Sequence, residues 1–192
     1  MKKKGIILTI ICIAFIATQS KAQFNYIGGG IVLTTANNGY VLNDYEFYNN
    51  TFGFDIRMNY NYSKKIQIAP DVKIYLPNKE SFPNGGSTKT TVFAFNLNGH
   101  FILNSRSRNS YRLYLLAGAH ISGWNIVDKR GSTTYGNYNS KDFKFVPGGN
   151  VGAGMQFKLS NRLLFYAEAK YVISQANQLI FNPGILYNFW FN

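Results

Sequence analysis

The chain has 192 residues, of which 17% are aromatic and only 15% are charged. This length fits one domain, and the composition excludes a disordered tail, a coiled coil and a collagen-like rod. The formal net charge is +12, and a single cysteine leaves neither a disulfide scaffold nor a cysteine-based zinc site.

The first 22 residues have the pattern of a secretory signal peptide. A basic start precedes an apolar run at 6–17 and a small-residue end at Ser20–Ala22. The apolar run is too short to cross a bilayer as a helix. We therefore expect cleavage after Ala22, which leaves a mature domain of residues 23–192. That domain loses four of the 20 basic residues and none of the 8 acidic ones, so its net charge is +8.

Within the mature domain, apolar and polar residues alternate with a period of two, which is typical of half-buried β-strands. The clearest strand spans Thr51–Tyr62, where every even position is apolar or aromatic and the odd positions include Asp55 and Arg57. A glycine-rich first strand is expected at about 24–35, although the sequence leaves open which of its faces is inward. The other seven strands are expected at 51–62, 66–76, 91–103, 111–123, 143–159, 163–173 and 179–191.

The connections between these strands alternate in length. Long polar connections are expected at about 36–50, 77–90 and 127–142, and shorter ones at 63–65, 104–110 and 160–162. Long loops at one end and short turns at the other are typical of outer-membrane barrels, in which an even strand number returns both chain ends to the periplasm. The sequence therefore predicts an all-β fold, an eight-stranded antiparallel up-and-down transmembrane β-barrel preceded by a cleaved signal peptide.

Two kinds of barrel fit eight alternating strands, a soluble lipocalin-like barrel with its apolar face inward and a membrane barrel with its apolar face toward lipid. The polar face here mixes glycine, asparagine and charges of both signs, and an eight-stranded interior has room for small polar side chains but for little else. The apolar face is therefore predicted to contact lipid, with aromatic girdles near the strand ends. The girdle residues are Phe52, Phe54, Tyr60, Tyr62, Tyr187, Phe189 and Phe191.

Charged residues on the polar face are expected to pair inside the lumen, because an unpaired buried charge is costly. A tight turn after the strand at 51–62 places Arg57 opposite Asp71 and Asp55 opposite Lys73 on the next strand. The alternatives are scattered, solvated lumen charges and a general acid–base pair of Glu168 with one of the two aspartates. The predicted ion-pair network consists of Asp55, Arg57, Asp71, Lys73, Glu168 and Lys170.

Three prolines, Pro70, Pro147 and Pro183, fall inside strand patterns although proline cannot donate a hydrogen bond to a ladder. They are expected at bulges or at strand ends above the membrane zone.

The segment Gln67–Val72, followed by Tyr75, resembles the third strand of the small outer-membrane β-barrel domain family that is common in Bacteroidetes-type bacteria. Residues Gly148–Phe157, followed by Leu163–Tyr171, resemble the later hairpin of that family. The resemblance covers most of the mature domain. It implies a porin-like fold and an outer-membrane location in a Gram-negative cell, and it implies no reaction.

Few residues suggest catalysis. His120 and Ser122 share one face of a strand and are similar to the His-x-Ser pair of outer-membrane lipid A deacylases, but that face is predicted to be the lumen. The next acids, Asp128 and Asp142, lie in or beside a loop. The only other histidine is His100, and nothing in the spacing demands a metal. We therefore expect no catalytic residue, no metal and no cofactor.

The net charge of the mature domain does not indicate nucleic acid, because an exported barrel rarely meets it and no stripe of basic and aromatic residues is visible. The expected partners are outer-membrane lipids and lipopolysaccharide, the barrel-assembly machinery, and an unknown protein at the long loops. Five basic residues of the long loops could meet outer-leaflet phosphates. They are Lys79, Lys89, Lys129, Arg130 and Lys141.

The sequence thus predicts a non-enzymatic integral outer-membrane barrel with a packed polar lumen and long surface loops, in a structural, adhesive or assembly-partner role. Two alternatives stay open. One is a narrow channel for small solutes, against which lumen ion pairs argue. The other is a lipid A-modifying hydrolase that uses His120 and Ser122.

Overall fold

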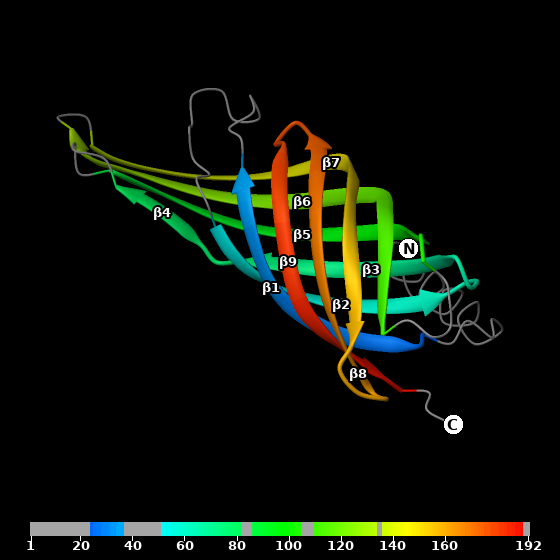
Figure 1. The fold of residues 1–192 in the computed structure, drawn as a ribbon. Coiled ribbons are helices and arrows are strands. Elements are labelled where there is room, and N and C mark those ends of the chain that lie inside the picture. Colours follow the sequence, from blue (N-terminus) through cyan, green and yellow to red (C-terminus); the bar gives the residue numbers. More distant parts are fainter. Residues whose placement is uncertain (1–23, 37–50, 82–85, 105–109, 134–135, 190–192) are drawn as a thin grey trace, which may run out of the picture.

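The computed structural model describes residues 24–36, 51–81, 86–104, 110–133 and 136–189, and this part of the chain is all β. Its strands are β1 (Tyr26–Ala36), β2 (Thr51–Asn61), β3 (Ile66–Tyr75), β4 (Asn78–Ser81), β5 (Ser87–Ile102), β6 (Tyr111–Thr133), β7 (Gly136–Lys158), β8 (Leu163–Ser174) and β9 (Gln178–Asn188) (Figure 1). None of the described residues lies in a helix that is long and apolar enough to cross a membrane.

The strands occupy eight positions in a closed antiparallel barrel. Hydrogen-bonded neighbours follow the order β3-β2-β1-β9-β8-β7-β6-β5, and pairing of β3 with β5 closes the ring. The short β4 pairs with β5 beyond the end of β3, so β3 and β4 share one position in the wall. The eight-stranded barrel predicted from the sequence is confirmed. The signal peptide expected at 1–22 lies outside the described residues.

Both ends of the described chain lie at the same end of the barrel, where Tyr26 of β1 pairs with Asn188 of β9. The short turns at 62–65 and 159–162 lie at this end as well. Outer-membrane barrels keep their short turns and chain ends in the periplasm, so we call this the periplasmic end and the opposite one the outer end.

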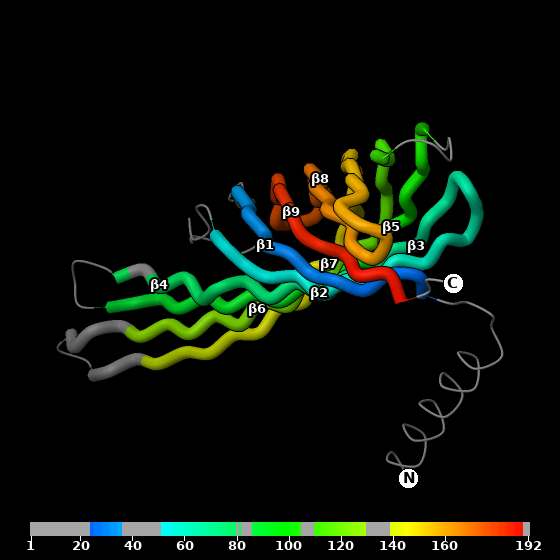
Figure 2. Tube along the Cα trace, turned by 60° about the horizontal axis from the view of Figure 1, so that its bottom comes forward, coloured from blue at the N-terminus to red at the C-terminus, as the bar shows by residue number. Residues whose placement is uncertain are grey.

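Two of the expected long loops are mostly strand, which corrects the sequence interpretation. Residues 127–133 and 136–142 continue β6 and β7 as paired strands, and residues 77–90 contain β4 paired with the start of β5. Figures 1 and 2 show these four strands leaving the barrel together at the outer end. We call this part the projecting sheet; it comprises β4 and residues 87–91, 125–133 and 136–143. Its strands lack a continuous apolar face, so the alternation that marks wall strands is weak there. Nearly all of the third expected loop, 36–50, lies outside the described residues.

The three prolines sit where a ladder is broken or absent. The β1–β9 ladder has a gap at Pro183 and the β2–β3 ladder has a gap at Pro70, with the same register on both sides of each gap. Pro147 pairs with β6 without interruption, and β7 gains β8 as its second neighbour only at Gly148. Two of the prolines therefore cause local ladder gaps within the wall, and neither bulges nor strand ends account for them.

The outward surface of the wall is apolar, and it carries those expected girdle residues that lie within the described ranges. Phe52 and Phe54 are each 59% exposed at the outer end of β2, and Tyr62 is 67% exposed beyond its periplasmic end. Tyr187 and Phe189 pack edge to face at 5.8 Å at the periplasmic end of β9. Tyr60 faces the same way and is half-buried, whereas Phe191 lies outside the described residues. Large apolar side chains exposed in this way require lipid around them.

The inward surface has three layers. At the outer end an apolar cluster fills the lumen, with Tyr75 and Trp124 as its largest members. Polar and charged side chains fill the middle, and apolar clusters around Tyr166 and Tyr114 lie toward the periplasmic end. In β1, Val32 is buried and Ile31 is 50% exposed, which settles the facing that the sequence leaves open.

The expectation that only small polar side chains fit inside is wrong, and glycines in the wall explain why. A Cβ on Gly154 would lie 2.5 Å from the hydroxyl oxygen of Tyr114, and a Cβ on Gly184 would collide with the hydroxyl oxygen of Tyr166. Each aromatic ring therefore lies against a stretch of wall that has no side chain, so the narrow lumen accommodates it.

Candidate functional site

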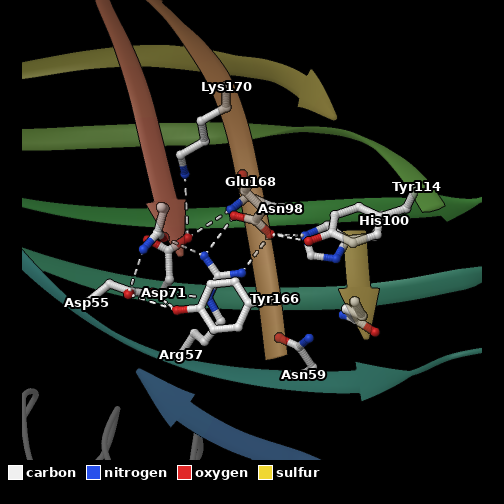
Figure 3. Close-up of polar contacts among 12 residues, drawn as sticks. Asp55, Arg57, Asn59, Asp71, Asn98, His100, Tyr114, Tyr166, Glu168 and Lys170 are labelled. Carbon is white, nitrogen blue, oxygen red and sulfur yellow. Dashed lines mark hydrogen bonds and ion pairs between the residues drawn. The ribbon is translucent and has the colours of Figure 1, made fainter. Parts of the chain in front are cut away.

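Six charged side chains from β2, β3 and β8 meet in the middle layer of the lumen. Figure 3 shows this layer, with every member except Lys73 labelled. The strands alternate their side chains between the two faces, so residues two apart on β2, β3 and β8 point inward together. β2 and β3 are neighbours, whereas β1 and β9 separate β8 from β2 in the wall. All six side chains are at most 3% exposed, and they are the predicted set of Asp55, Arg57, Asp71, Lys73, Glu168 and Lys170.

The register between β2 and β3 is the one that the sequence predicts, because Asp55 pairs with Lys73 and Arg57 pairs with Asp71. The side-chain contacts only partly follow this register. The ammonium of Lys73 lies 3.8 Å from Asp55, but it is closer to Asp71, at 3.2 Å. The guanidinium of Arg57 turns away from Asp71 and reaches across the lumen.

Arg57 is the centre of the network. Its two terminal nitrogens donate to both carboxylate oxygens of Glu168, at 2.6 and 2.7 Å, and its Nε donates to Asp55 at 3.0 Å. The guanidinium carbon also lies 4.1 Å from the centre of the Tyr166 ring. A bidentate arginine–carboxylate pair has strong directional preferences, so this contact fixes β2 relative to the far wall.

Asp71 is a second centre. It lies 3.2 Å from the ammonium of Lys73 and 3.5 Å from that of Lys170. The side-chain amides of Asn96 and Asn98 donate to its two oxygens at 2.6 and 2.9 Å. This carboxylate is therefore held by two cations and two amides from β3, β5 and β8.

Asn182 joins the two centres. Its side-chain oxygen accepts hydrogen bonds from Arg57 at 2.8 Å and from Lys73 at 2.9 Å, and its amide donates to Asp55 at 2.9 Å. One amide on β9 thus bridges both cations of β2 and β3 and one of their counter-ions.

Two tyrosines and a histidine complete the network. The hydroxyl of Tyr114 donates to Glu168 at 2.8 Å, and that of Tyr166 donates to Asp55 at 2.9 Å. The His100 ring stacks on Tyr114 with 4.3 Å between ring centres, and its Nε2 lies 3.4 Å from Glu168. Glu168 and Asp55 therefore each accept hydrogen bonds from Arg57 and from a tyrosine.

The network is electrically balanced, since it contains three carboxylates and three cations. Burying a single ion costs several kcal/mol, so a set of charges with almost no contact with solvent is stable only when every member is paired. The arrangement is therefore a packed, mutually compensated plug, which differs from the alternative of scattered and solvated charges.

Sequence reasoning missed the uncharged members of this plug. These members point inward in the same alternation as the acids on their own or neighbouring strands, and that alternation is the signal that could have found them. They are Asn96, Asn98, Asn182, Tyr114 and Tyr166. Their roles depend on the register between strands that are distant in the sequence, which alternation alone does not provide.

The arrangement offers little for catalysis. His120 is buried, and its Nδ1 lies 2.7 Å from the side-chain oxygen of Asn96 rather than bonding to Ser122. The hydroxyl of Ser122 accepts a hydrogen bond from Trp124 and donates to the carbonyl of Val146. Both side chains face the lumen, away from any lipid substrate. Glu168 is fully engaged by Arg57, and no group of three His, Cys, Asp or Glu in the described ranges is placed to hold a metal ion.

Comparisons with known proteins give the same architecture. The Yersinia pestis attachment invasion locus protein Ail, solved with the heparin analogue sucrose octasulfate, is 17% identical with a TM-score of 0.58, covering 86% of this chain and 97% of that one. Neisserial surface protein A is 16% identical with a TM-score of 0.58, covering 88% and 100% of the two chains. The N-terminal barrel of Pseudomonas aeruginosa OprF is 13% identical with a TM-score of 0.52, covering 86% and 98%. At these identities the likeness concerns the fold alone.

A search of curated proteins found no match. The family model of the outer membrane protein beta-barrel domain matches residues 7–189, which is nearly the whole chain. The match agrees with the closed eight-position barrel, its apolar outer surface and its paired interior. The chain therefore belongs to the outer membrane protein beta-barrel domain family, and it is an outer-membrane β-barrel protein.

Proposed function

We propose that this protein is a non-enzymatic outer-membrane barrel with a closed lumen, which acts through the sheet that it raises above the membrane. The observation that carries the proposal is the bidentate pair between Arg57 of β2 and Glu168 of β8, which spans the lumen. A pair in this position blocks the path that an ion or solute would take between the two ends.

The rest of the lumen supports the closed state. Apolar side chains fill it above the charge network, and further apolar clusters lie below. A narrow small-solute channel would require polar groups that contact water along its whole length. Here the charged side chains of the central layer are at most 3% exposed, and Lys73 and Asn182 have 0% exposure.

The outer end supports a structural, adhesive or assembly-partner role. The projecting sheet continues the backbone pairing of β5, β6 and β7 beyond the wall, so it is stiffer than a loop of the same length. The structural relative Ail is described as an attachment invasion locus protein. A rigid surface of this kind suits recognition of a protein outside the cell.

The remaining partners follow from the location. We propose that the segment 1–22 is a signal peptide removed at export, that the mature domain 23–192 is inserted by the barrel-assembly machinery, and that outer-membrane lipids and lipopolysaccharide surround it. The apolar outward surface supports contact with lipid.

Current recordings in planar lipid bilayers test the closed lumen. The wild-type barrel is expected to give no steady channels, whereas Arg57→Ala, folded as judged by its resistance to unfolding in cold SDS, is expected to give small ones. Arg162→Ala removes the same charge from an exposed periplasmic turn and is expected to behave as wild type. Steady wild-type channels of uniform size would overturn the proposal in favour of a solute channel.

Mass spectrometry of lipid A tests the absence of an enzyme. Cells with and without the gene are expected to have the same acyl pattern. An acyl chain lost only when the gene is present, and restored by Ser122→Ala, would show that the barrel is a lipid A-modifying hydrolase.

A further inference from the structure

One face of the projecting sheet carries a row of lysines. Strand register places Lys79 of β4 opposite Lys89 of β5, Lys89 opposite Val127 of β6, and Val127 opposite Lys141 of β7. Residues paired in this way share a face, so the three lysines form one line across the sheet. Lys129 lies on the same face two residues further along β6, and all four lysines are exposed.

The acids of the sheet, which are Glu80, Asp128 and Asp142, lie in other rows than the lysines, and Glu80 pairs with Thr88. Asp128 pairs with Thr88 and accepts a hydrogen bond from its hydroxyl, and Asp142 pairs with Ile126 and lies 3.4 Å from the ammonium of Lys144. These positions alternate with the lysine row, so they face the opposite side. Among the side chains that the structure describes, no ion pair joins the four lysines to an acid.

This arrangement is unfavourable without a counter-ion. Like charges directly opposite each other on neighbouring strands are destabilising, and Lys79 and Lys89 are such a pair. Adjacent strands are about 4.8 Å apart, so Lys89 and Lys141, on either side of β6, stand about 10 Å apart. The row is thus wide enough to bind a headgroup with more than one anionic centre.

The position of the lysine row along the strands places it close to the membrane surface. Phe143 lies two residues from Lys141 on the same face of β7, which is about 7 Å along the strand. Phe143 packs with Phe93 at 6.1 Å and with Phe145 at 4.8 Å between ring centres, and the three rings are exposed where the wall meets the projecting sheet. Clustered aromatic rings mark the interface of a membrane barrel, so the lysines lie at the level of the lipid headgroups.

We propose that this lysine face, formed by Lys79, Lys89, Lys129 and Lys141, binds the phosphate groups of lipid A in the outer leaflet. The face is continuous with the lipid-facing surface, because Lys89 and Lys141 have the same phase on their strands as Phe93 and Phe143. Long lysine side chains reach from such a position to interfacial phosphates while their methylene groups contact apolar surface. The bound lipid neutralises the row and holds the projecting sheet at a fixed height above the membrane.

Native mass spectrometry of the refolded mature barrel in detergent tests this proposal, with purified bisphosphorylated lipid A as the probe. The test variant combines Lys79→Gln, Lys89→Gln and Lys141→Gln. The control combines Lys64→Gln, Lys65→Gln and Lys158→Gln, which removes the same charge from exposed residues at the periplasmic end. Cold SDS gels verify that both variants are folded.

The test variant is expected to bind bisphosphorylated lipid A at least about tenfold more weakly than wild type, and the control to remain within about twofold. Dephosphorylated lipid A is expected to bind equally weakly to all three proteins. Equal losses in the two variants would overturn the proposal, because the effect would then be one of net charge. Equal binding of bisphosphorylated and dephosphorylated lipid A by the wild type would also overturn it. So would binding of soluble sucrose octasulfate at this face without binding of lipid A.

Discussion

The side-chain amide of Asn182 donates a hydrogen bond to the backbone carbonyl of Ile31 at 2.9 Å. This contact lies in the gap of the β1–β9 ladder, where Pro183 has no N–H to offer. The same side chain accepts hydrogen bonds from Arg57 and Lys73. Asn182 thus supplies a hydrogen bond that the β1–β9 ladder lacks at Pro183, and it also joins the two centres of the lumen network.

Asn182→Ala is expected to destabilise the barrel by about 3 kcal/mol, because it leaves the partly buried carbonyl of Ile31 and two buried cations each short of one partner. Pro183→Ala restores an N–H to the ladder, so the loss caused by Asn182→Ala is expected to be smaller in that background. Urea unfolding in phospholipid vesicles measures both effects. Asn139→Ala, at an exposed position of β7, serves as the control, and a loss at Asn182 no greater than this control would refute the bridging role.

The pair of Arg57 with Glu168 is expected to behave as a coupled unit. Arg57→Met and Glu168→Met each leave a buried charge without its partner, which costs about 3–5 kcal/mol. The double variant keeps the lumen neutral, so its loss is expected to fall short of the sum by about 2 kcal/mol or more. Additive losses in the same vesicle assay would show that the two groups do not interact.

Gly154 is expected to provide the space that the Tyr114 side chain occupies in the lumen. Gly154→Ala places a Cβ against the Tyr114 hydroxyl and displaces it from Glu168, so a loss of about 1–3 kcal/mol is expected. Gly99→Ala is the matched control, because the nearest atom to its Cβ would be the carbonyl oxygen of Ala117 at 3.6 Å. If both variants unfold at the same urea concentration, the space that Gly154 leaves for Tyr114 does not contribute to the free energy of unfolding.

The outward surface gives a test of immersion in lipid. Ile56 is 62% exposed in the middle of β2, and Ile56→Arg is expected to cost about 2–4 kcal/mol because the charge enters the hydrocarbon region. Asn125→Arg, on the outward face of the projecting sheet, is expected to cost less than about 1 kcal/mol. A tolerated arginine at residue 56 in vesicles would contradict the placement of this surface in lipid.

Much of the barrel could be predicted from alternation. Even positions of 52–62 are apolar and odd ones polar, so the inward phase of Asp55 and Arg57 follows from the sequence, and a tight turn then sets the register with Asp71 and Lys73. The contact between Arg57 and Glu168 could not be predicted in this way, because it crosses a lumen between strands that do not pair. The strands of the projecting sheet could not be predicted for a different reason, because their residues do not alternate between an apolar and a polar face.

The interior also shows what residue size alone fails to predict. Tyr114 and Tyr166 are too large for an average eight-stranded lumen, and they fit because glycines stand opposite them across the ladder. Pro183 is likewise unable to donate to its ladder, and the side chain of Asn182 supplies the missing donor. In the first case a tyrosine and a glycine on neighbouring strands together satisfy the packing of the lumen. In the second case two adjacent residues together satisfy the hydrogen bonding of the ladder. Neither requirement can be recognised from one of the two residues alone.

The most direct test of the closed lumen is the reactivity of a thiol placed inside it. Residues 23–192 contain no cysteine, so Ser122→Cys introduces a single, nearly isosteric thiol at a side chain that is 1% exposed. Ser110→Cys places the same thiol in an exposed position at the periplasmic end. A closed lumen predicts that a charged, water-soluble methanethiosulfonate reagent modifies the thiol at residue 122 at least about 100-fold more slowly than that at residue 110 in the folded barrel. Equal rates at the two positions would show that water and ions enter the lumen, and would contradict the account.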